Sequence, residues 1–260
     1  MEESTVTRSK SRIETIDVLR GFALVGILYA HMIIWYTGAA LPPEVYTSYN
    51  STPDGIALGI FGALVFGKFF SVFSFLFGLS FFLHFRKRSG SNHTRLYLWR
   101  LFLLFLIGLL HHILWRGDIL AIYAVLGAVL FLFRKLHPGL LLFLALLLVT
   151  NTPTHLYQAF TTEITSAQVE FPMATEAESY YDLVKNADFS TVLLDNWRSW
   201  PAKITYQLES GRLLMTFGYF LLGLYAGRPG LFTAFVAHIS KFRRWNHLSK
   251  KAVLFLLSSG

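Results

Sequence analysis

The sequence predicts an all-α fold, a polytopic bundle of transmembrane helices with about six spans, an incomplete seventh and a helical loop outside the membrane. Apolar residues make up 54% of the chain and charged residues only 15%, whereas soluble domains usually carry about a quarter charged residues. Long apolar runs recur along the chain, and basic residues gather in the stretches between them. Such basic clusters are typical of cytoplasmic loops in membrane proteins.

The first apolar run, residues 16–36, follows a basic tail at residues 1–15. A cleavable signal peptide has the same order, and the small residues at 38–40 offer a cleavage site. The run is nevertheless about 20 residues long, which is enough to cross about 30 Å of hydrocarbon, and it carries Asp17 and Arg20 in its first turn. We therefore expect a retained helix.

Four further runs complete a predicted five-helix membrane region at residues 16–150. They cover residues 55–83, 101–115, 119–133 and 139–149. The run at 55–83 is long for one span, and its recurrent glycines favour a tilted or broken helix. Pro138 opens the run at 139–149, which is acceptable because proline is tolerated in the first turn of a helix.

Residues 151–210 form an acidic segment, with eight Asp and Glu residues against three Lys and Arg. Aromatic residues interspersed among these charges favour helices at the membrane interface over a disordered linker. Residues 211–260 contain a sixth run at 213–226, a basic loop and a short run at 252–257. Six apolar residues cannot cross a bilayer, so this last run either lies on the surface or begins a helix that the chain does not complete.

The loops predict the orientation of the bundle. If the chain alternates sides at each run, the basic clusters all fall on one side, at residues 8–12, 86–100, 134–135 and 228–251. The stretch at 38–54 contains no Lys or Arg, and it falls on the other side together with the acidic segment. Because basic loops stay inside, we expect a cytoplasmic N-terminus and an extracytoplasmic acidic segment.

Other classes of protein and site are disfavoured. The net charge of +8 comes from clusters between apolar runs, which does not indicate nucleic-acid binding. The chain has no Cys, and it contains neither a phosphate-binding glycine loop nor the H-E-x-x-H spacing of a zinc site. A metal held by His31, His111, His112 and Asp118 is the open alternative, but without such a ligand spacing the sequence predicts no metal site and no permanently bound cofactor.

Ionisable residues inside the first run indicate a functional face. Such residues are costly at membrane depth and often mark sites. Asp17 and Arg20 are three apart and adjoin on a helix, and His31 follows eleven residues later, about three turns or roughly 16 Å further along. The three residues therefore share a face, which favours a polar wall of a cavity. The alternatives are an interfacial ion pair and a packing histidine.

A second polar group lies at the outer end of the third run. It consists of His111, His112, Trp115, Arg116 and Asp118. If the helix persists, His111 and Asp118 are seven residues apart and face the same way. A carboxylate beside a histidine fixes its tautomer and raises its basicity, as a general base requires. The alternative is an interfacial belt that anchors the helix end.

Several motifs resemble the YeiB-like bacterial membrane proteins, a family that is largely a domain of unknown function. They are I-D-V-L-R-G-F-A at 16–23, F-S-V-F-S-F-L-F-G at 70–78, G-L-L-H at 108–111, G-D-I-L at 117–120 and L-G-L-Y-A-G-R at 222–228. The resemblance covers residues 13–228 in order. Members of that family usually continue with several more helices.

The wider resemblance is to transmembrane acyltransferases, namely the heparan-α-glucosaminide acetyltransferase-like and polysaccharide O-acyltransferase proteins. These open with an Asp/Arg pair in the first helix, and in the O-acyltransferase branch a His follows the Arg by about three turns, as His31 follows Arg20. The resemblance implies a protein of the bacterial inner membrane that transfers an acyl group from cytoplasmic acyl-CoA to an envelope glycan or lipid.

On that reading His31, His111 and Asp118 are the catalytic candidates. The substrate-binding candidates are Asp17, Arg20, His112 and Arg116. A transporter or exporter in which the same charges line a path, and a non-enzymatic membrane protein, are the alternatives.

Overall fold

The computed structural model describes residues 14–34, 36–39, 41–42, 45, 51–86, 91–162 and 173–228. These residues form helices joined by short connections and contain no strand, which confirms the all-α prediction for the described part of the chain. The predicted basic tail before residue 14 and the predicted run at 252–257 lie outside the described residues.

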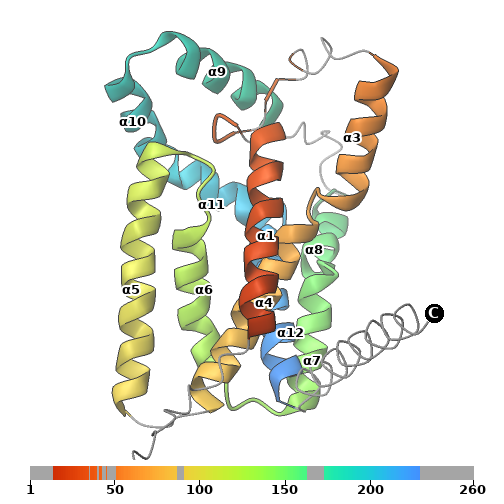
Figure 1. Cartoon of the computed structure of the whole chain (residues 1–260), viewed down its shortest axis with the longest axis vertical. Coiled ribbons are helices and arrows are strands. Elements are labelled where there is room, and N and C mark those ends of the chain that lie inside the picture. Colours follow the sequence, from red (N-terminus) through yellow and green to blue (C-terminus); the bar gives the residue numbers. More distant parts are fainter. Residues whose placement is uncertain are drawn as a thin grey trace, which may run out of the picture.

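Helices far apart in the sequence lie side by side in one bundle (Figure 1). The bundle consists of α1 (Glu14–Ile33), α4 (Lys68–Arg86), α5 (Ser91–Leu114), α6 (Leu120–Phe133), α7 (Pro138–Val149) and α12 (Arg212–Gly227). Three helices of the acidic segment, α9 (Met173–Asn186), α10 (Phe189–Arg198) and α11 (Trp200–Glu209), cross one end of it. We call α9–α11 the helical cap. The other helices of the described residues are α3 (Thr52–Leu64) and α8 (Thr152–Thr162).

Three helical stretches in the described residues are long and apolar enough to cross a membrane, at Thr15–Ile33, Thr52–Arg86 and Asn92–Leu114. A fourth arises if α7 and α8, which are bent by 51° at their junction, cross as one span. The apolar helices α6 and α12 are shorter, at 14 and 16 residues. The structure therefore contains apolar helices of membrane-spanning length, while the count of about six spans stays a prediction.

The long second run is interrupted, as the recurrent glycines led us to expect. It forms α3 and α4, and the three turn residues between them end at Gly67, whose φ of +73° is a conformation that favours glycine. The whole stretch of 35 residues would extend about 52 Å as a straight helix, well beyond the roughly 30 Å of bilayer hydrocarbon. A tilt or break is thus required if it crosses a membrane.

Helix α1 turns its large apolar side chains away from the bundle. Val18, Phe22 and Val25 are between 62% and 69% exposed, whereas Ala23 on the opposite face is fully buried. A helix on a soluble protein shows the reverse arrangement, with its apolar stripe facing the core. An outward apolar face of this kind is suited to contact with lipid or with another apolar surface.

Helices α4 and α12 form the most intimate contact of the bundle. A Cβ atom at Gly78 would overlap the Phe220 carbonyl oxygen, and one at Gly223 would overlap the Phe75 carbonyl oxygen. The two glycines therefore let the backbones touch, as small residues do between membrane helices. Phe77 and Phe220 stack beside this contact with ring centroids 4.5 Å apart.

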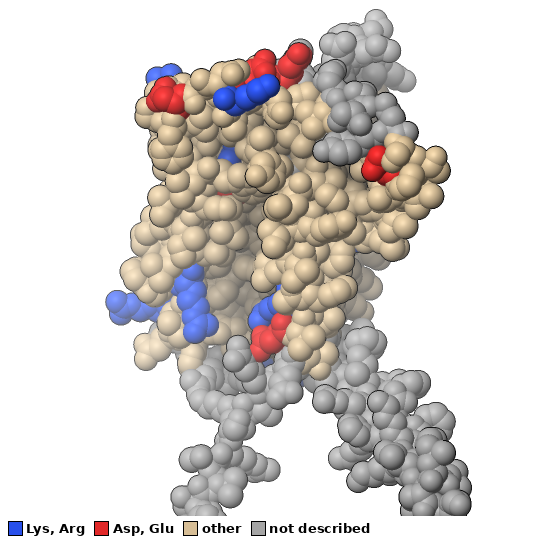
Figure 2. Space-filling model, turned by 45° about the horizontal axis from the view of Figure 1, so that its top comes forward, with Lys and Arg blue, Asp and Glu red and all other residues tan. Residues whose placement is uncertain are grey.

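Charged side chains gather toward the two ends of the molecule and leave a broad belt of other residues between them (Figure 2). The cap carries one group of charges. At the opposite end lie Arg86 at the last turn of α4, Arg95 at the first turns of α5 and Arg134 after α6. A belt of uncharged residues between two charged ends matches the water–hydrocarbon–water profile of a bilayer, while the orientation expected from the loops stays a prediction.

Candidate functional site

A cavity of about 300 Å³ lies beneath the helical cap. We call it the cap cavity. Its polar lining includes His31, His111, Asp118, Lys203, Gln207 and Arg212. These residues come from α1, α5, the turn before α6, α11 and α12, so segments from most of the chain length meet there.

The His111 and Asp118 side chains form a hydrogen-bonded pair at the cavity wall. His111 Nδ1 lies 2.8 Å from Asp118 Oδ1, and the Asp118 side chain is fully buried while that of His111 is 44% exposed. Asp118 also accepts hydrogen bonds from the backbone N–H groups of Leu120 at 3.1 Å and Ala121 at 3.3 Å. A carboxylate only accepts hydrogen bonds, so in a neutral His111 imidazole this contact places the proton on Nδ1 and leaves the lone pair on Nε2. That arrangement suits a general base.

The pair forms for a different reason than the sequence argument assumed. Helix α5 ends at Leu114 and does not continue to Asp118. The chain turns through residues 115–117, and the Asp118 N–H donates to the Trp115 carbonyl at 3.3 Å. The carboxylate then returns to the start of α6, where its backbone contacts cap the helix.

His31 and His111 both contact the indole ring of Trp115. The ring centroids are 4.7 Å apart for His31 and 5.5 Å apart for His111. His31 comes from the last turn of α1 and is half-buried. The two predicted catalytic histidines therefore belong to one cavity and share an aromatic neighbour.

His112 lies outside the lining of the cap cavity and joins the cap to the bundle. It is fully buried, and its Nε2 donates to the Asn196 carbonyl oxygen at 2.8 Å. The Asn196 side chain donates to the Ile113 carbonyl at 3.0 Å and accepts from the Tyr180 hydroxyl at 2.7 Å. These satisfied buried contacts hold α9 and α10 on the end of α5, so a direct contact between His112 and substrate has no support in this geometry.

Arg116 is one of the residues that line the cap cavity. Its guanidinium stacks 4.7 Å above the Tyr180 ring and lies 3.7 Å from an Asp195 carboxylate oxygen. The predicted substrate-binding arginine thus also ties the cap to the turn after α5.

Lys203 is a member of the site that the sequence argument did not select. Its Nζ donates to His112 Nδ1 at 3.0 Å and to the Arg116 carbonyl at 3.4 Å. Burial lowers the pKa of Lys203 to about 8, with Asp118 acting to raise it and Arg116 to lower it further. Its one signal in the sequence is that it is one of three basic residues in the acidic segment.

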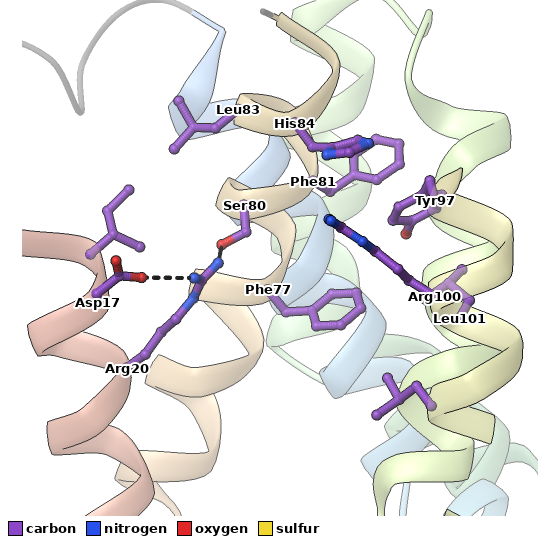
Figure 3. A pocket seen from close by; sticks show the side chains of 12 residues that line it. Asp17, Arg20, Phe77, Ser80, Phe81, Leu83, His84, Tyr97, Arg100 and Leu101 are labelled. Carbon is purple, nitrogen blue, oxygen red and sulfur yellow. Dashed lines mark hydrogen bonds and ion pairs between the residues drawn. The ribbon is translucent and has the colours of Figure 1, made fainter. Parts of the chain in front are cut away.

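A second pocket, of about 610 Å³, is lined by the start of α1, the second half of α4 and the first half of α5. We call it the basic pocket. Figure 3 shows Arg20 from α1 and Arg100 from α5 extending toward α4 from opposite sides. Arg20 lies 3.2 Å from Asp17, as the spacing predicted, and it also donates to the Ser80 hydroxyl. His84 adds another nitrogen-bearing side chain to the lining.

The two pockets are neighbours along the bundle. On α1, Arg20 lines the basic pocket and Leu24 lines the cap cavity. On α4, Phe77 lines the basic pocket and Phe73 lines the cap cavity. Four residues of helix span about 6 Å. The Tyr123 ring contacts both phenylalanine rings, with centroids 5.7 and 5.8 Å away. Residues about one helical turn apart therefore line different pockets, and three aromatic rings pack together at the level where the two linings meet.

Among the residues that the structure describes, no group of three or more His, Asp or Glu side chains is arranged to hold a metal ion.

Comparison with known proteins gives relatives but no function. No family model matches the chain, and no solved structure matches it. The chain is 35% identical over 144 residues to the uncharacterized protein YxaH of Bacillus subtilis, an alignment that covers 52% of this chain and 36% of that protein. It is 32% identical over 140 residues to an uncharacterized 39.9 kDa protein in the amylase 3′ region of Bacillus acidopullulyticus, covering 53% and 38%. The aligned part therefore spans well under half the length of these relatives.

Proposed function

We propose that the chain belongs to a YeiB-like acyltransferase of the bacterial inner membrane, which moves an acyl group from cytoplasmic acyl-CoA to an envelope glycan or lipid. The observation that carries the proposal is the His111–Asp118 pair, which leaves His111 Nε2 as an acceptor beside the cap cavity. This is the arrangement that general-base activation of a hydroxyl requires.

The proposed reaction is a direct transfer of the acyl group. His111 Nε2 removes the proton from an acceptor hydroxyl, and the hydroxyl oxygen attacks the thioester carbonyl carbon. The carbon–sulfur bond breaks, the ester forms, and the CoA thiolate leaves with the proton that His111 returns. Asp118 stabilises the imidazolium between these two proton transfers. His31, across the Trp115 ring, is the alternative base.

The donor would enter from the basic pocket. CoA carries phosphate groups, and guanidinium groups bind phosphate through several parallel hydrogen bonds. Arg20 and Arg100 line this pocket from two different helices, and Ser80 and Asp17 orient the Arg20 side chain. In this account acyl-CoA is a substrate, and no cofactor stays bound.

A membrane location with a cytoplasmic N-terminus is part of the same proposal. The outward apolar face of α1 and the belt between the charged ends in Figure 2 support insertion into a bilayer. The basic ends of α4 and α5 support a cytoplasmic basic pocket, and the acidic composition of the cap supports an outer cap cavity.

One observation favours a transporter as the second candidate. The basic pocket and the cap cavity are lined by residues one helical turn apart on α1 and on α4, and the rings of Phe73, Phe77 and Tyr123 pack together at this level. A rotation of these rings would join the pockets into a path, and ionisable residues commonly line such paths. The acyltransferase reading is preferred because the hydrogen-bonded His111–Asp118 pair supplies a base at one end.

The proposal is tested with purified full-length protein in liposomes, supplied with radiolabelled acetyl-CoA and a crude envelope fraction as acceptor. Label should move into the acceptor with release of free CoA thiol, and His111→Ala should abolish transfer while it leaves the thermal unfolding temperature near that of the wild type. Proton-coupled movement of a solute without any CoA-dependent signal would favour the transporter. Full rates in both His31→Ala and His111→Ala would remove the site assignment.

A further inference from the structure

Three polar side chains of the cap cavity take no part in the chemistry described above. They are Lys203, Gln207 and Arg212, and they come from α11 and from the first residue of α12. Each has hydrogen-bonding capacity that the fold leaves unused. Their charges and donors indicate which class of molecule the cavity binds.

Lys203 has one donor left after its contacts with the protein. Its ammonium group carries three N–H donors, and two of them are directed to His112 Nδ1 and to the Arg116 carbonyl. The nearby Asp118 carboxylate already accepts from His111 and from two backbone N–H groups. The positive charge of Lys203 therefore has no hydrogen-bonded carboxylate among the described residues.

Arg212 brings a second cation to the same space. Its Nε atom is buried and has no hydrogen-bond partner, and its guanidinium lies 5.4 Å from the centre of the Phe70 ring. An unsatisfied buried donor on a charged group is costly, and an anionic ligand would satisfy it.

Gln207 contributes the opposite kind of group. The residue is only 8% exposed, and its buried Oε1 atom has no hydrogen-bond partner. An amide oxygen needs a donor, and a ligand hydroxyl supplies one. One turn of α11 separates Lys203 from Gln207, so the two residues project from the same face of that helix.

We infer that the cap cavity binds a small polyol that carries a phosphate or carboxylate group. Lys203 and Arg212 hold the anionic group, Gln207 accepts a hydrogen bond from a hydroxyl, and a further hydroxyl is free to meet His111. A volume of about 300 Å³ lies at the small end of ligand pockets, so the bound unit has about the size of a glycerol phosphate or one sugar ring. The inference rests on the proposed function, because the anionic polyol would be the acceptor of the acyl group.

The test measures binding, so it does not depend on turnover. Full-length protein in phosphatidylcholine nanodiscs is titrated by calorimetry with sn-glycerol 3-phosphate, glycerol, glucuronate and glucose. Both anionic compounds should bind at least about tenfold more tightly than their neutral counterparts, since charge-assisted hydrogen bonds are about twice as strong as neutral ones. Equal affinities within each pair would overturn the inference.

Variants assign the contacts. Lys203→Met and Arg212→Gln should each weaken binding of glycerol 3-phosphate at least tenfold, about 1.4 kcal/mol, whereas Lys185→Met on the exposed face of α9 should not. Lys203→Arg should retain binding, which separates a lost charge from a misfolded cap. Gln207→Leu should weaken glycerol 3-phosphate but leave inorganic phosphate unchanged. An identical affinity in the Lys203, Arg212 and Lys185 variants would contradict the assignment.

Two further experiments distinguish a lipid from a soluble ligand, and the binding proposal from the acyltransferase proposal. If the natural ligand is a lipid headgroup, nanodiscs of phosphatidylglycerol should suppress the binding of soluble glycerol 3-phosphate. If the natural ligand is a soluble compound, these nanodiscs should leave that binding unchanged. Both results are consistent with the anion-binding site and differ only in the source of the ligand. Binding of glycerol 3-phosphate without any binding of CoA would sink the acyltransferase proposal and leave the anionic site standing. Binding of CoA without binding of the anionic polyols would overturn the anionic site and leave the acyltransferase proposal standing.

Discussion

Replacement of Asp118 tests the proposed base most sharply, because the carboxylate has two separable roles. One oxygen accepts from His111 Nδ1 at 2.8 Å and from the Leu120 N–H at 3.1 Å. The other accepts from the Ala121 N–H at 3.3 Å. Asp118→Asn keeps one accepting oxygen and removes the charge, whereas Asp118→Ala removes every contact.

The expected magnitudes follow from these contacts. The Asn amide cannot accept from all three donors, so Asp118→Asn should lose at least one backbone hydrogen bond, which costs about 1 kcal/mol of unfolding free energy. Asp118→Ala should lose three and cost about 3 kcal/mol. Both should lower the transfer rate at least about 100-fold, because the imidazolium loses its carboxylate and the histidine its fixed tautomer.

The assay combines acetyl transfer from radiolabelled acetyl-CoA with thermal unfolding of the purified variants. The informative result is a nearly inactive Asp118→Asn variant whose unfolding temperature stays close to that of the wild type. Asp188→Asn serves as a control, since Asp188 caps α10 through the Thr191 N–H and lies on the exposed surface of the cap. If Asp118→Asn keeps transfer within threefold of the wild type, the carboxylate only caps α6 and the reasoning is refuted.

Three other predictions follow from the packing and the charges. Gly223→Ala should destabilise the bundle by about 1–3 kcal/mol, because its Cβ would overlap the Phe75 carbonyl oxygen. Gly59→Ala, in open space, should stabilise α3 by up to about 1 kcal/mol. Thermal unfolding in detergent compares the two variants, and equal shifts of the unfolding temperature would contradict the packing of α4 against α12. Arg100→Gln should weaken CoA binding about tenfold, and Arg95→Gln, at an exposed position outside the basic pocket, should leave a calorimetric titration unchanged. Binding of glycerol 3-phosphate should fall as pH rises above the Lys203 pKa of about 8, because the ammonium loses its charge, and Lys203→Arg should keep binding at higher pH; a flat profile in the wild type would count against a role for Lys203.

The fold class was predictable because composition and periodicity are local properties of the chain. Apolar runs and basic loops give helices and their ends without knowledge of the partners. The number of membrane spans is harder to predict from the sequence, because α3 and α4 form one continuous apolar stretch and α7 and α8 form a bent pair. Whether such pairs cross once depends on tertiary packing at Gly67 and at the junction of α7 and α8, which local hydropathy does not report.

The site was only half predictable for a related reason. Helical spacing brought Asp17 next to Arg20 and placed His31 on the bundle side, since these residues share one helix. His111 and Asp118 lie in contact, but through the turn after Leu114 and not through the continuous helix on which the expectation was based. Lys203, Gln207 and Arg212 follow His111 by 92, 96 and 101 residues. Only tertiary packing brings them to the cavity, and no local period of the sequence encodes that packing.

The most direct measurement of the central claim is sided acyl transfer in sealed proteoliposomes of known protein orientation. The chain contains no Cys, so a single Glu178→Cys on the exposed surface of the cap reports orientation by its reaction with a membrane-impermeant thiol reagent. With acetyl-CoA supplied only on the side of the basic pocket and acceptor only on the side of the cap, the account predicts labelled acceptor on the cap side and free CoA on the donor side. Transfer only when both substrates share one side, or no transfer at all, would contradict it.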